Sequence, residues 1–170
     1  MKIAIIYATV GGTTRECAEL LARELEHHEV TLIEMGGDGI EYSEYDALVI
    51  GFPIRMGKAM RVARKYMKQH ADELAEQKVA YYMTCGFIDC FDEYAQNVIP
   101  ESVRASAIDV ACLGGSLEAS RFKGFDRLVV RSVRDEILGG GENGEERDDM
   151  TLPTILEENI AQLADELKKL

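Results

Sequence analysis

The chain has 170 residues, of which 46% are hydrophobic and 29% charged, a composition typical of one globular domain spanning residues 1–170. Its formal net charge of −12 argues against nucleic acid as a general partner, because duplex binding depends on neutralising phosphates with Lys and Arg. No apolar run reaches the length of a membrane span, and the first residues lead into a strand without a cleavable signal pattern, so we expect a cytoplasmic protein.

The first predicted element is a short apolar strand at residues 3–7, IAIIY, which runs directly into a turn rich in Gly and Thr. Continuous apolar runs of this length are typical of central parallel strands. A helix is predicted at residues 14–28, so the turn lies where hydroxyls and helix-start N–H groups together make an anion site. Its glycines let the backbone come close to a ligand. The turn therefore predicts a phosphate cradle, and the alternative is an ordinary helix cap.

The residues of the predicted cradle are Thr9, Val10, Gly11, Gly12, Thr13 and Thr14. A Walker loop needs a Lys after its last Gly to reach the outer phosphates of a nucleoside triphosphate, and Thr13 stands there instead. The dinucleotide fingerprint G-x-G-x-x-G is also missing from this turn. Hydroxyls and amides alone suit a single terminal phosphate. In this respect the turn resembles the phosphate loop of flavodoxins, T-x-T-G-x-T, which holds flavin mononucleotide (FMN).

Strands and helices then alternate along the middle of the chain. Strands are expected at residues 30–35, 47–51 and 79–84, and helices at residues 59–75 and 92–99. The second and third of these strands end in loops, and open α/β sheets bind ligands at the carboxyl ends of their strands. These loops therefore add two groups of candidate ligand contacts. The candidates are Pro53, Ile54, Arg55, Met56 and Gly57 in the first loop and Thr84, Cys85, Gly86 and Phe87 in the second.

The last part of the chain is predicted to hold a strand at residues 108–113, an extended loop at 116–123, a helix at 126–138, an acidic loop at 139–150 and a closing helix at 152–170. The helix at 126–138 departs from the acidic character of the chain. Its arginines at 127, 131 and 134 share one face. One interpretation is a solvated face that pairs with acidic neighbours, and the other is a patch for an anionic substrate or membrane headgroups.

The four cysteines do not form a recognisable metal or disulfide pattern. Cys17 and Cys112 lie in apolar segments and are predicted to be core residues. Cys85 and Cys90 have no second Cys/His pair beside them, so the sequence does not predict a zinc site. A structural disulfide is not expected in a reducing cytoplasm. A redox role for Cys85 and Cys90 is left open.

The alternation of strands and helices predicts a parallel sheet with helices on both faces. Five strands without a large insertion indicate a flavodoxin-like three-layer α/β sandwich with strand order 2-1-3-4-5. Response-regulator receivers share this order, but they need acidic residues after the first strand and a phospho-accepting Asp at the end of the third. This chain has Ala8 and Thr9 at the first place, and Gly51 and Phe52 at the second, so the receiver hypothesis fails.

Two motifs carry a more specific resemblance. The segments ATVGGTTR, at residues 8–15, and IRMG, at residues 54–57, resemble the flavodoxin-domain family that includes menaquinone-dependent protoporphyrinogen IX dehydrogenase. Members show a strand, then S-T-x-x-G-x-T-R, and a third strand that ends in I-R-x-G. The resemblance covers most of the chain, but the acidic segment at residues 85–94 does not match. It implies FMN as the cofactor.

The resulting hypothesis is an FMN-dependent oxidoreductase similar to protoporphyrinogen IX dehydrogenase, with a small molecule or a quinone as redox partner. The cradle would hold the phosphate, and the two later loops would line opposite sides of the flavin ring, with Phe87 as a stacking partner. Arg55 would stabilise a reduced anionic flavin or meet an acidic substrate. The region from Arg121 to Arg134 would give a peripheral contact at the inner face of the membrane. The alternative is a flavodoxin-type electron carrier without a substrate of its own, whose acidity steers docking.

Overall fold

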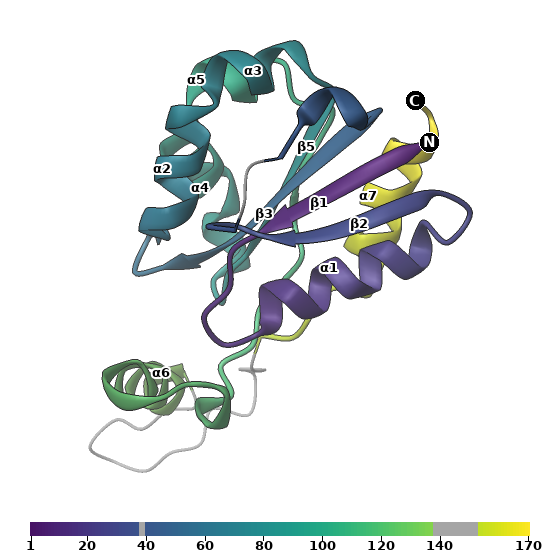
Figure 1. Cartoon of the computed structure of the whole chain (residues 1–170). Coiled ribbons are helices and arrows are strands. Elements are labelled where there is room, and N and C mark those ends of the chain that lie inside the picture. The colour runs from purple at the N-terminus through teal and green to yellow at the C-terminus, as the bar shows by residue number, and fades with distance from the viewer. Residues whose placement is uncertain (38–39, 138–152) are drawn as a thin grey trace.

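A computed structural model describes residues 1–37, 40–137 and 153–170. Its centre is a parallel sheet in the order β2-β1-β3-β5-β6, and a short strand, β4, pairs antiparallel with the end of β3 (Figure 1). Counted over the parallel strands, this is the predicted order 2-1-3-4-5, so the predicted fold class is confirmed. The strands are β1 (Lys2–Tyr7), β2 (Glu29–Glu34), β3 (Ala47–Arg55), β4 (Lys58–Ala59), β5 (Val79–Thr84) and β6 (Val110–Cys112).

Helices cover both faces of the sheet, which gives three layers (Figure 1). One face carries α1 (Thr13–Glu24) and α7 (Glu157–Lys168). The other carries α2 (Arg61–Gln69), α3 (Ala71–Glu76), α4 (Phe91–Val98) and α5 (Glu101–Arg104). Side chains alternate between the two layers along each strand, so Ile3 and Ile5 face α1 and α7 while Ala4 and Ile6 face the other side. Because β1 is apolar at all these positions, it is buried on both faces.

The third strand is longer than the sequence predicted. The sequence interpretation ended it at Gly51 and placed a loop after it, but β3 continues to Arg55 and turns back into β4. Met56 has φ of 48° and Gly57 has φ of 71°, and two successive residues with positive φ are what a tight two-residue hairpin requires. Part of the predicted loop is therefore a β-hairpin.

Several other predicted boundaries were wrong. The single helix expected at residues 59–75 is divided into α2 and α3 at His70, whose φ is −110° and whose ring packs against Tyr66. The first helix ends at Glu24 rather than at residue 28. The closing helix begins at Glu157, because the preceding backbone bonds to the end of β6 through Leu156 N–H and the Leu113 carbonyl at 3.1 Å. The predicted loop at 139–150 lies outside the described residues.

The helix predicted at residues 126–138 is α6 (Gly124–Ile137), and it covers neither face of the sheet. Figure 1 shows it beyond the carboxyl ends of the strands, separate from both helical layers. A single 3₁₀ turn at Ala119–Arg121 leads into it from β6. This position brings α6 to the edge where parallel α/β sheets bind their ligands.

Candidate functional site

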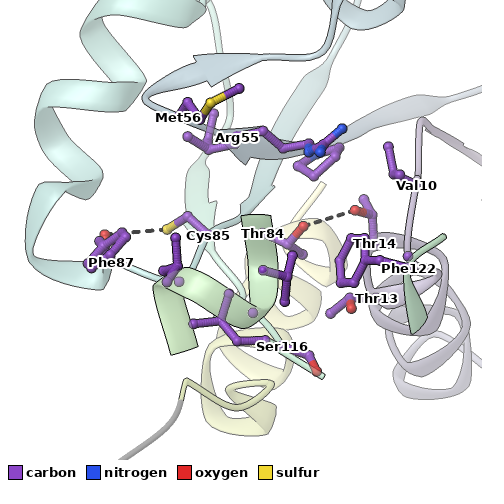
Figure 2. Close-up of a pocket in the computed structure, with 18 of the residues that line it drawn as sticks. Val10, Thr13, Thr14, Arg55, Met56, Thr84, Cys85, Phe87, Ser116 and Phe122 are labelled. Carbon is purple, nitrogen blue, oxygen red and sulfur yellow. Dashed lines mark hydrogen bonds between the residues drawn. The ribbon is translucent and has the colours of Figure 1, made fainter. Parts of the chain in front are cut away.

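The carboxyl edge of the sheet contains a cavity of about 370 Å³, within the usual size of a small-molecule site. The carboxyl ends of β3 and β5 and the segments that follow β1, β3, β5 and β6 form its walls, and α6 closes it from outside the sheet (Figure 2). All the residues predicted from the sequence line it except Gly12. Those it brings together are Thr9, Val10, Gly11, Thr13, Thr14, Pro53, Ile54, Arg55, Met56, Gly57, Thr84, Cys85, Gly86 and Phe87.

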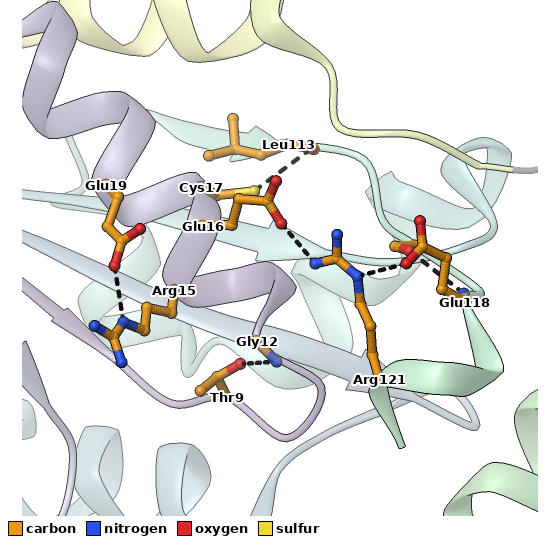
Figure 3. Close-up of polar contacts among 10 residues, drawn as sticks. Thr9, Gly12, Arg15, Glu16, Cys17, Glu19, Leu113, Glu118 and Arg121 are labelled. Atoms are coloured by element: carbon orange, nitrogen blue, oxygen red, sulfur yellow. Dashed lines mark hydrogen bonds and ion pairs between the residues drawn. The ribbon is translucent and has the colours of Figure 1, made fainter.

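Gly12 shapes the first loop from outside the cavity wall. It is the residue before α1, its φ is 86°, and its N–H donates to Thr9 Oγ1 at 3.0 Å (Figure 3). The residue itself lines a shallow outer groove beside Arg15 and Glu19. Gly12 therefore allows the chain to turn into α1, so that Thr13 and Thr14, in the first turn of the helix, reach the cavity.

A buried set of contacts ties this loop to the middle of the sheet. Thr14 Oγ1 lies 2.9 Å from Thr84 Oγ1, at the end of β5. Tyr82, also in β5, donates its hydroxyl to the Thr14 carbonyl at 2.8 Å. The Tyr82 ring fits only because residue 51 is glycine, since a Cβ there would lie 2.0 Å from Tyr82 Cζ. The start of α1 is thus held at a fixed position relative to β3 and β5.

The two ends of the cavity differ in chemistry. Figure 2 shows Val10, Thr13 and Thr14 grouped at one end and Phe87 at the other, with Met56 above. The hydroxyl end also has the N-terminus of α1, which favours negative charge. The other end is apolar, and its mouth exposes 81% of Met56 and 51% of Phe87. Exposed apolar side chains at the rim of a cavity mark a surface that contacts ligands or partners.

Two ion pairs fasten α6 and its lead-in over the cavity. Arg55, at the end of β3, pairs with Asp126 in α6, and both side chains are about one-third exposed. Arg121 bonds to Glu16 in α1 at 2.6 Å and to Glu118 at 2.9 Å (Figure 3). The sequence identified Arg55 as a charge for the flavin or an acidic substrate, but in the structure a carboxylate already partners it.

Sequence reasoning missed part of the cavity wall. The missed residues are Tyr94, Gly115, Ser116, Leu117, Phe122, Val129, Val130 and Val133. The loop after β6 contains glycines, as the other ligand-edge loops do, and that signal was available in the sequence. Phe122 gave no such signal. Its ring lies against Gly11, where a Cβ would come within 2.6 Å of Phe122 Cζ.

Three of the four cysteines are buried, and Cys90 is partly exposed. Cys17 and Cys112 are buried, so their prediction as core residues is confirmed. Burial raises the pKa of Cys17 to about 12. Cys85 is buried as well, yet it forms part of the cavity wall. Among residues 1–37, 40–137 and 153–170, no group of three or more His, Cys, Asp or Glu side chains is arranged to hold a metal ion.

The sheet is parallel and has helices on both faces, and its carboxyl edge combines a hydroxyl-lined helix start with an apolar cavity. These features are typical of the α/β domains that bind phosphate-bearing cofactors. The sequence pattern of the family described as Flavodoxin domain matches residues 4–142, so the chain belongs to the flavodoxin domain family. The resemblance found from the sequence motifs is thereby confirmed.

Two relatives from different organisms, both similar to this chain in sequence, have the same name. Protoporphyrinogen IX dehydrogenase (quinone) of Escherichia coli strain K12 is 28% identical over an alignment of 153 positions, which covers 84% of this chain and 82% of that protein. The protein of the same name from Leishmania major is 23% identical over an alignment of 150 positions, which covers 82% of this chain and 64% of that protein.

Solved structures of flavodoxins share the fold. Fusobacterium nucleatum flavodoxin bound to flavin mononucleotide has a TM-score of 0.53 at 13% identity, covering 99% of this chain and 97% of that one. Two-electron reduced Megasphaera elsdenii flavodoxin has a TM-score of 0.54 at 16% identity, covering 65% of this chain and 84% of that one. At these identities the likeness bears on the fold alone.

Proposed function

We propose that this protein is an FMN-dependent oxidoreductase that oxidises a porphyrinogen-like substrate and passes the electrons to a quinone. One observation carries the proposal: a single cavity joins a hydroxyl-lined helix start to an apolar slot with α6 as its outer wall. The membership of the flavodoxin domain family supports the cofactor, and the names of the Escherichia coli and Leishmania major relatives support the substrate and the acceptor.

The residues present fit FMN. Thr13 and Thr14, with the N–H groups at the start of α1, would hold the phosphate. Ile54, near the end of β3, and Phe87, in the loop after β5, would flank the ring. Gly11 keeps the backbone of the first loop thin enough for Phe122 to lie on it. When bound, the flavin supplies the two-electron redox chemistry, and the protein supplies binding, orientation and exclusion of water.

The cavity wall carries few groups that could move a proton. Among the described residues that line it, the only ionisable side chains are Arg55, Cys85 and Tyr94. Arg55 is paired with Asp126. The hydrogen bond with Cys112, together with burial, raises the pKa of Cys85, and burial raises the pKa of Tyr94. The wall therefore acts mainly by positioning, and the apolar side chains of α6, at Val129, Val130 and Val133, suit a largely apolar substrate.

The cofactor is tested first, by adding FMN to the purified chain, desalting it and measuring the retained absorbance near ~450 nm. Thr13→Ala removes a hydroxyl from the phosphate end, and we expect it to weaken FMN binding about 10- to 100-fold, the loss of one hydrogen bond to a charged group. Thr31→Ala is the matched control, since Thr31 is exposed on β2. A wild-type chain that keeps no flavin would refute the proposed cofactor.

The substrate is tested anaerobically with the FMN-loaded protein. We expect protoporphyrinogen to be oxidised to fluorescent protoporphyrin at a rate that depends on both the protein and an added menaquinone analogue.

The second candidate function is that of an electron carrier, which is favoured by the net charge of −12 and by the exposed Phe87 and Met56 at the mouth of the cavity. Electron transfer that requires a partner protein, with no porphyrinogen turnover, would replace the first candidate by the second.

We also propose that the protein works in the cytoplasm and meets the inner face of the membrane through α6, where a quinone is available. The outer side of α6 exposes 75% of Phe125 and 64% of Leu128, and Arg127 and Arg131 are exposed beside them. Apolar and basic side chains on one helix face suit an anionic lipid surface. In the described part of the chain, no helix has the length and apolar character needed to span a bilayer.

Liposome co-sedimentation tests this contact. We expect binding to vesicles with anionic lipid that falls with salt, and a strong loss in the double variant Phe125→Ser/Leu128→Ser. The matched control is Leu32→Ser, an exposed apolar residue on β2. Sedimentation of the wild type at the background level of neutral vesicles would rule out the contact.

A further inference from the structure

Two thiols lie side by side at the carboxyl edge of the sheet. Cys85 follows β5 and Cys112 is the last residue of β6, and their sulfur atoms are 3.4 Å apart. The sheet fixes this approach, because Met83 lies opposite Cys112 in the register and the Cys85 N–H bonds to the Gly114 carbonyl at 2.8 Å. An S–S bond needs about 2.05 Å, so the two sulfurs, now 3.4 Å apart, must move closer by more than an ångström for a bond to form.

The pair separates two openings of the molecule. Cys85 belongs to the wall of the main cavity, whereas Cys112 belongs to the wall of a second groove that runs along the edge strand β6. Both residues are almost buried, with 4% of Cys85 and 5% of Cys112 exposed. A molecule in the second groove would therefore approach the pair from the Cys112 side.

The two sulfurs differ in acidity. The hydrogen bond that the two thiols share lowers the pKa of Cys112 below its ordinary value. The same bond, together with burial, raises the pKa of Cys85, whose Sγ also lies 3.6 Å from the Phe87 carbonyl. Because Cys112 is the member of the pair in the wall of the second groove, it is the nucleophile toward a disulfide there, and Cys85, on the side of the main cavity, is the resolving thiol.

The second groove has a charge preference. Three carboxylates line it, Asp89 and Asp92 from the segment after β5 and Asp109 before β6. Among the described residues of its wall there is no Lys or Arg. An acidic groove raises the local concentration of cations and lowers that of anions.

We propose that Cys85 and Cys112 are a redox-active dithiol that reduces small cationic disulfides entering the groove along β6. The Cys112 thiolate attacks one sulfur of R–S–S–R, a mixed disulfide forms, and the first RS⁻ leaves and takes a proton. Cys85, after losing its proton to solvent, attacks the Cys112 sulfur and releases the second RS⁻. In sum two protein thiols lose two electrons and two protons, and the disulfide becomes two molecules of RSH.

This activity goes beyond the proposed flavin function and does not require it. The experiment uses the full-length reduced chain, anaerobically, both without added FMN and after FMN loading. Cystamine, with two positive charges, is compared with the neutral 2-hydroxyethyl disulfide and the dianionic 3,3′-dithiodipropionate. We expect two thiols released per chain, a Cys85–Cys112 bond in the peptide map, and cystamine at least about tenfold faster than the dianion at low salt.

Single variants separate the two roles. Cys85→Ser is expected to stop at a stable mixed disulfide on Cys112, with one thiol released, and Cys112→Ser to lose at least about ninety per cent of the rate. Cys90→Ser is the matched control, since Cys90 is the remaining cysteine near the site, and its rate should equal that of the wild type. Asp89→Asn/Asp92→Asn should reduce the preference for cystamine, as should added salt.

The peptide map of the wild type decides the proposal even if a variant fails to fold. A disulfide that joins Cys85 to Cys90, or a mixed disulfide that persists in the wild type, would overturn it. Equal rates for the cationic and anionic reagents would overturn the assignment of the acidic groove. Because flavin retention is measured separately, failure here leaves the proposed function untouched, and failure of flavin binding leaves this proposal untouched.

Discussion

Replacing Gly51 by alanine puts a methyl group where the Tyr82 ring already lies. The new Cβ would be 2.0 Å from Cζ, 2.2 Å from Cε1 and 2.3 Å from the hydroxyl oxygen of Tyr82. The ring cannot move aside easily, since Tyr82 is fully buried and its hydroxyl bonds to the Thr14 carbonyl at 2.8 Å. Overpacking of this kind costs about 1–3 kcal/mol or more, and we expect the top of that range.

An opposing effect is smaller. Alanine restricts the unfolded chain more than glycine does, which stabilises the native state by about 0.4–1 kcal/mol where the backbone accepts it. The expected net loss for Gly51→Ala is therefore at least about 2 kcal/mol, or roughly 4–8 °C in the melting temperature of a domain of this size. Gly37→Ala is the matched control, because its nearest neighbour outside the adjoining residues is the Glu34 carbonyl at 3.5 Å, an ordinary contact.

The assay is urea unfolding of Gly51→Ala, Tyr82→Ala and the double variant, which together form a double-mutant cycle. Tyr82→Ala alone should cost about 3–5 kcal/mol, as large-to-small core substitutions do. Once the ring is gone, the methyl at position 51 has space, so the double variant should be more stable than the sum of the two by about 1–3 kcal/mol. Additive losses, or a Gly51→Ala chain as stable as Gly37→Ala, would refute the steric reasoning.

Three further predictions concern buried polar groups. The buried Tyr81 hydroxyl has no hydrogen-bond partner among the described residues, so Tyr81→Phe should raise the free energy of unfolding by about 1 kcal/mol. The Tyr82 hydroxyl donates to the Thr14 carbonyl, so Tyr82→Phe should lower it by a similar amount. Urea midpoints that move in the same direction for both variants would contradict this. Thr14→Val and Thr84→Val each leave the other hydroxyl buried and unpaired, so each should lower the free energy of unfolding by about 1–3 kcal/mol. The double variant leaves neither hydroxyl and should lose no more stability than the worse single variant. Stability losses that simply add in urea unfolding would contradict this. Burial raises the pKa of the Cys17 thiol from 9.0 to about 12, so the buried thiol contributes its full stabilisation below pH 9. Between pH 9 and pH 12 the free energy of unfolding should fall by about 1.4 kcal/mol per pH unit. Cys17→Ala should therefore show a shallower fall in stability at alkaline pH, and an unchanged slope would count against the assignment.

The parts of the fold that could be predicted from the sequence are those with a local signal. The runs that became β1 and β5 are apolar throughout, which is how strands buried on both faces appear in a sequence. Once the strand order follows from the alternation with helices, the loops after successive strands must meet at one edge. The cavity residues in the loops after β1, β3 and β5 were found in this way.

The parts that could not be predicted depend on long-range contacts. Pro53 lacks an N–H and ordinarily argues against a strand. β3 nevertheless continues through it, because Pro53 and Thr84 form the last pair between β3 and β5, and the hairpin with β4 begins at the next residue, Ile54. The pairing of Arg55 with Asp126 joins residues 71 positions apart, and nothing local in either segment indicates it. The position of α6 at the cavity follows from such contacts rather than from its own periodicity.

The contact of Phe122 with Gly11 connects the first loop of the cavity to α6. Phe122 lies two residues before α6 and its ring rests on the first loop, while its neighbour Arg121 is bonded to Glu16 in α1. A ligand that displaced that ring would also move the segment that leads into α6, and a contact that pulled α6 outward would lift the ring from the loop. Two occupants of this protein, one at the loop and one against the helix, would then change each other's affinity by the same factor, as thermodynamic reciprocity requires.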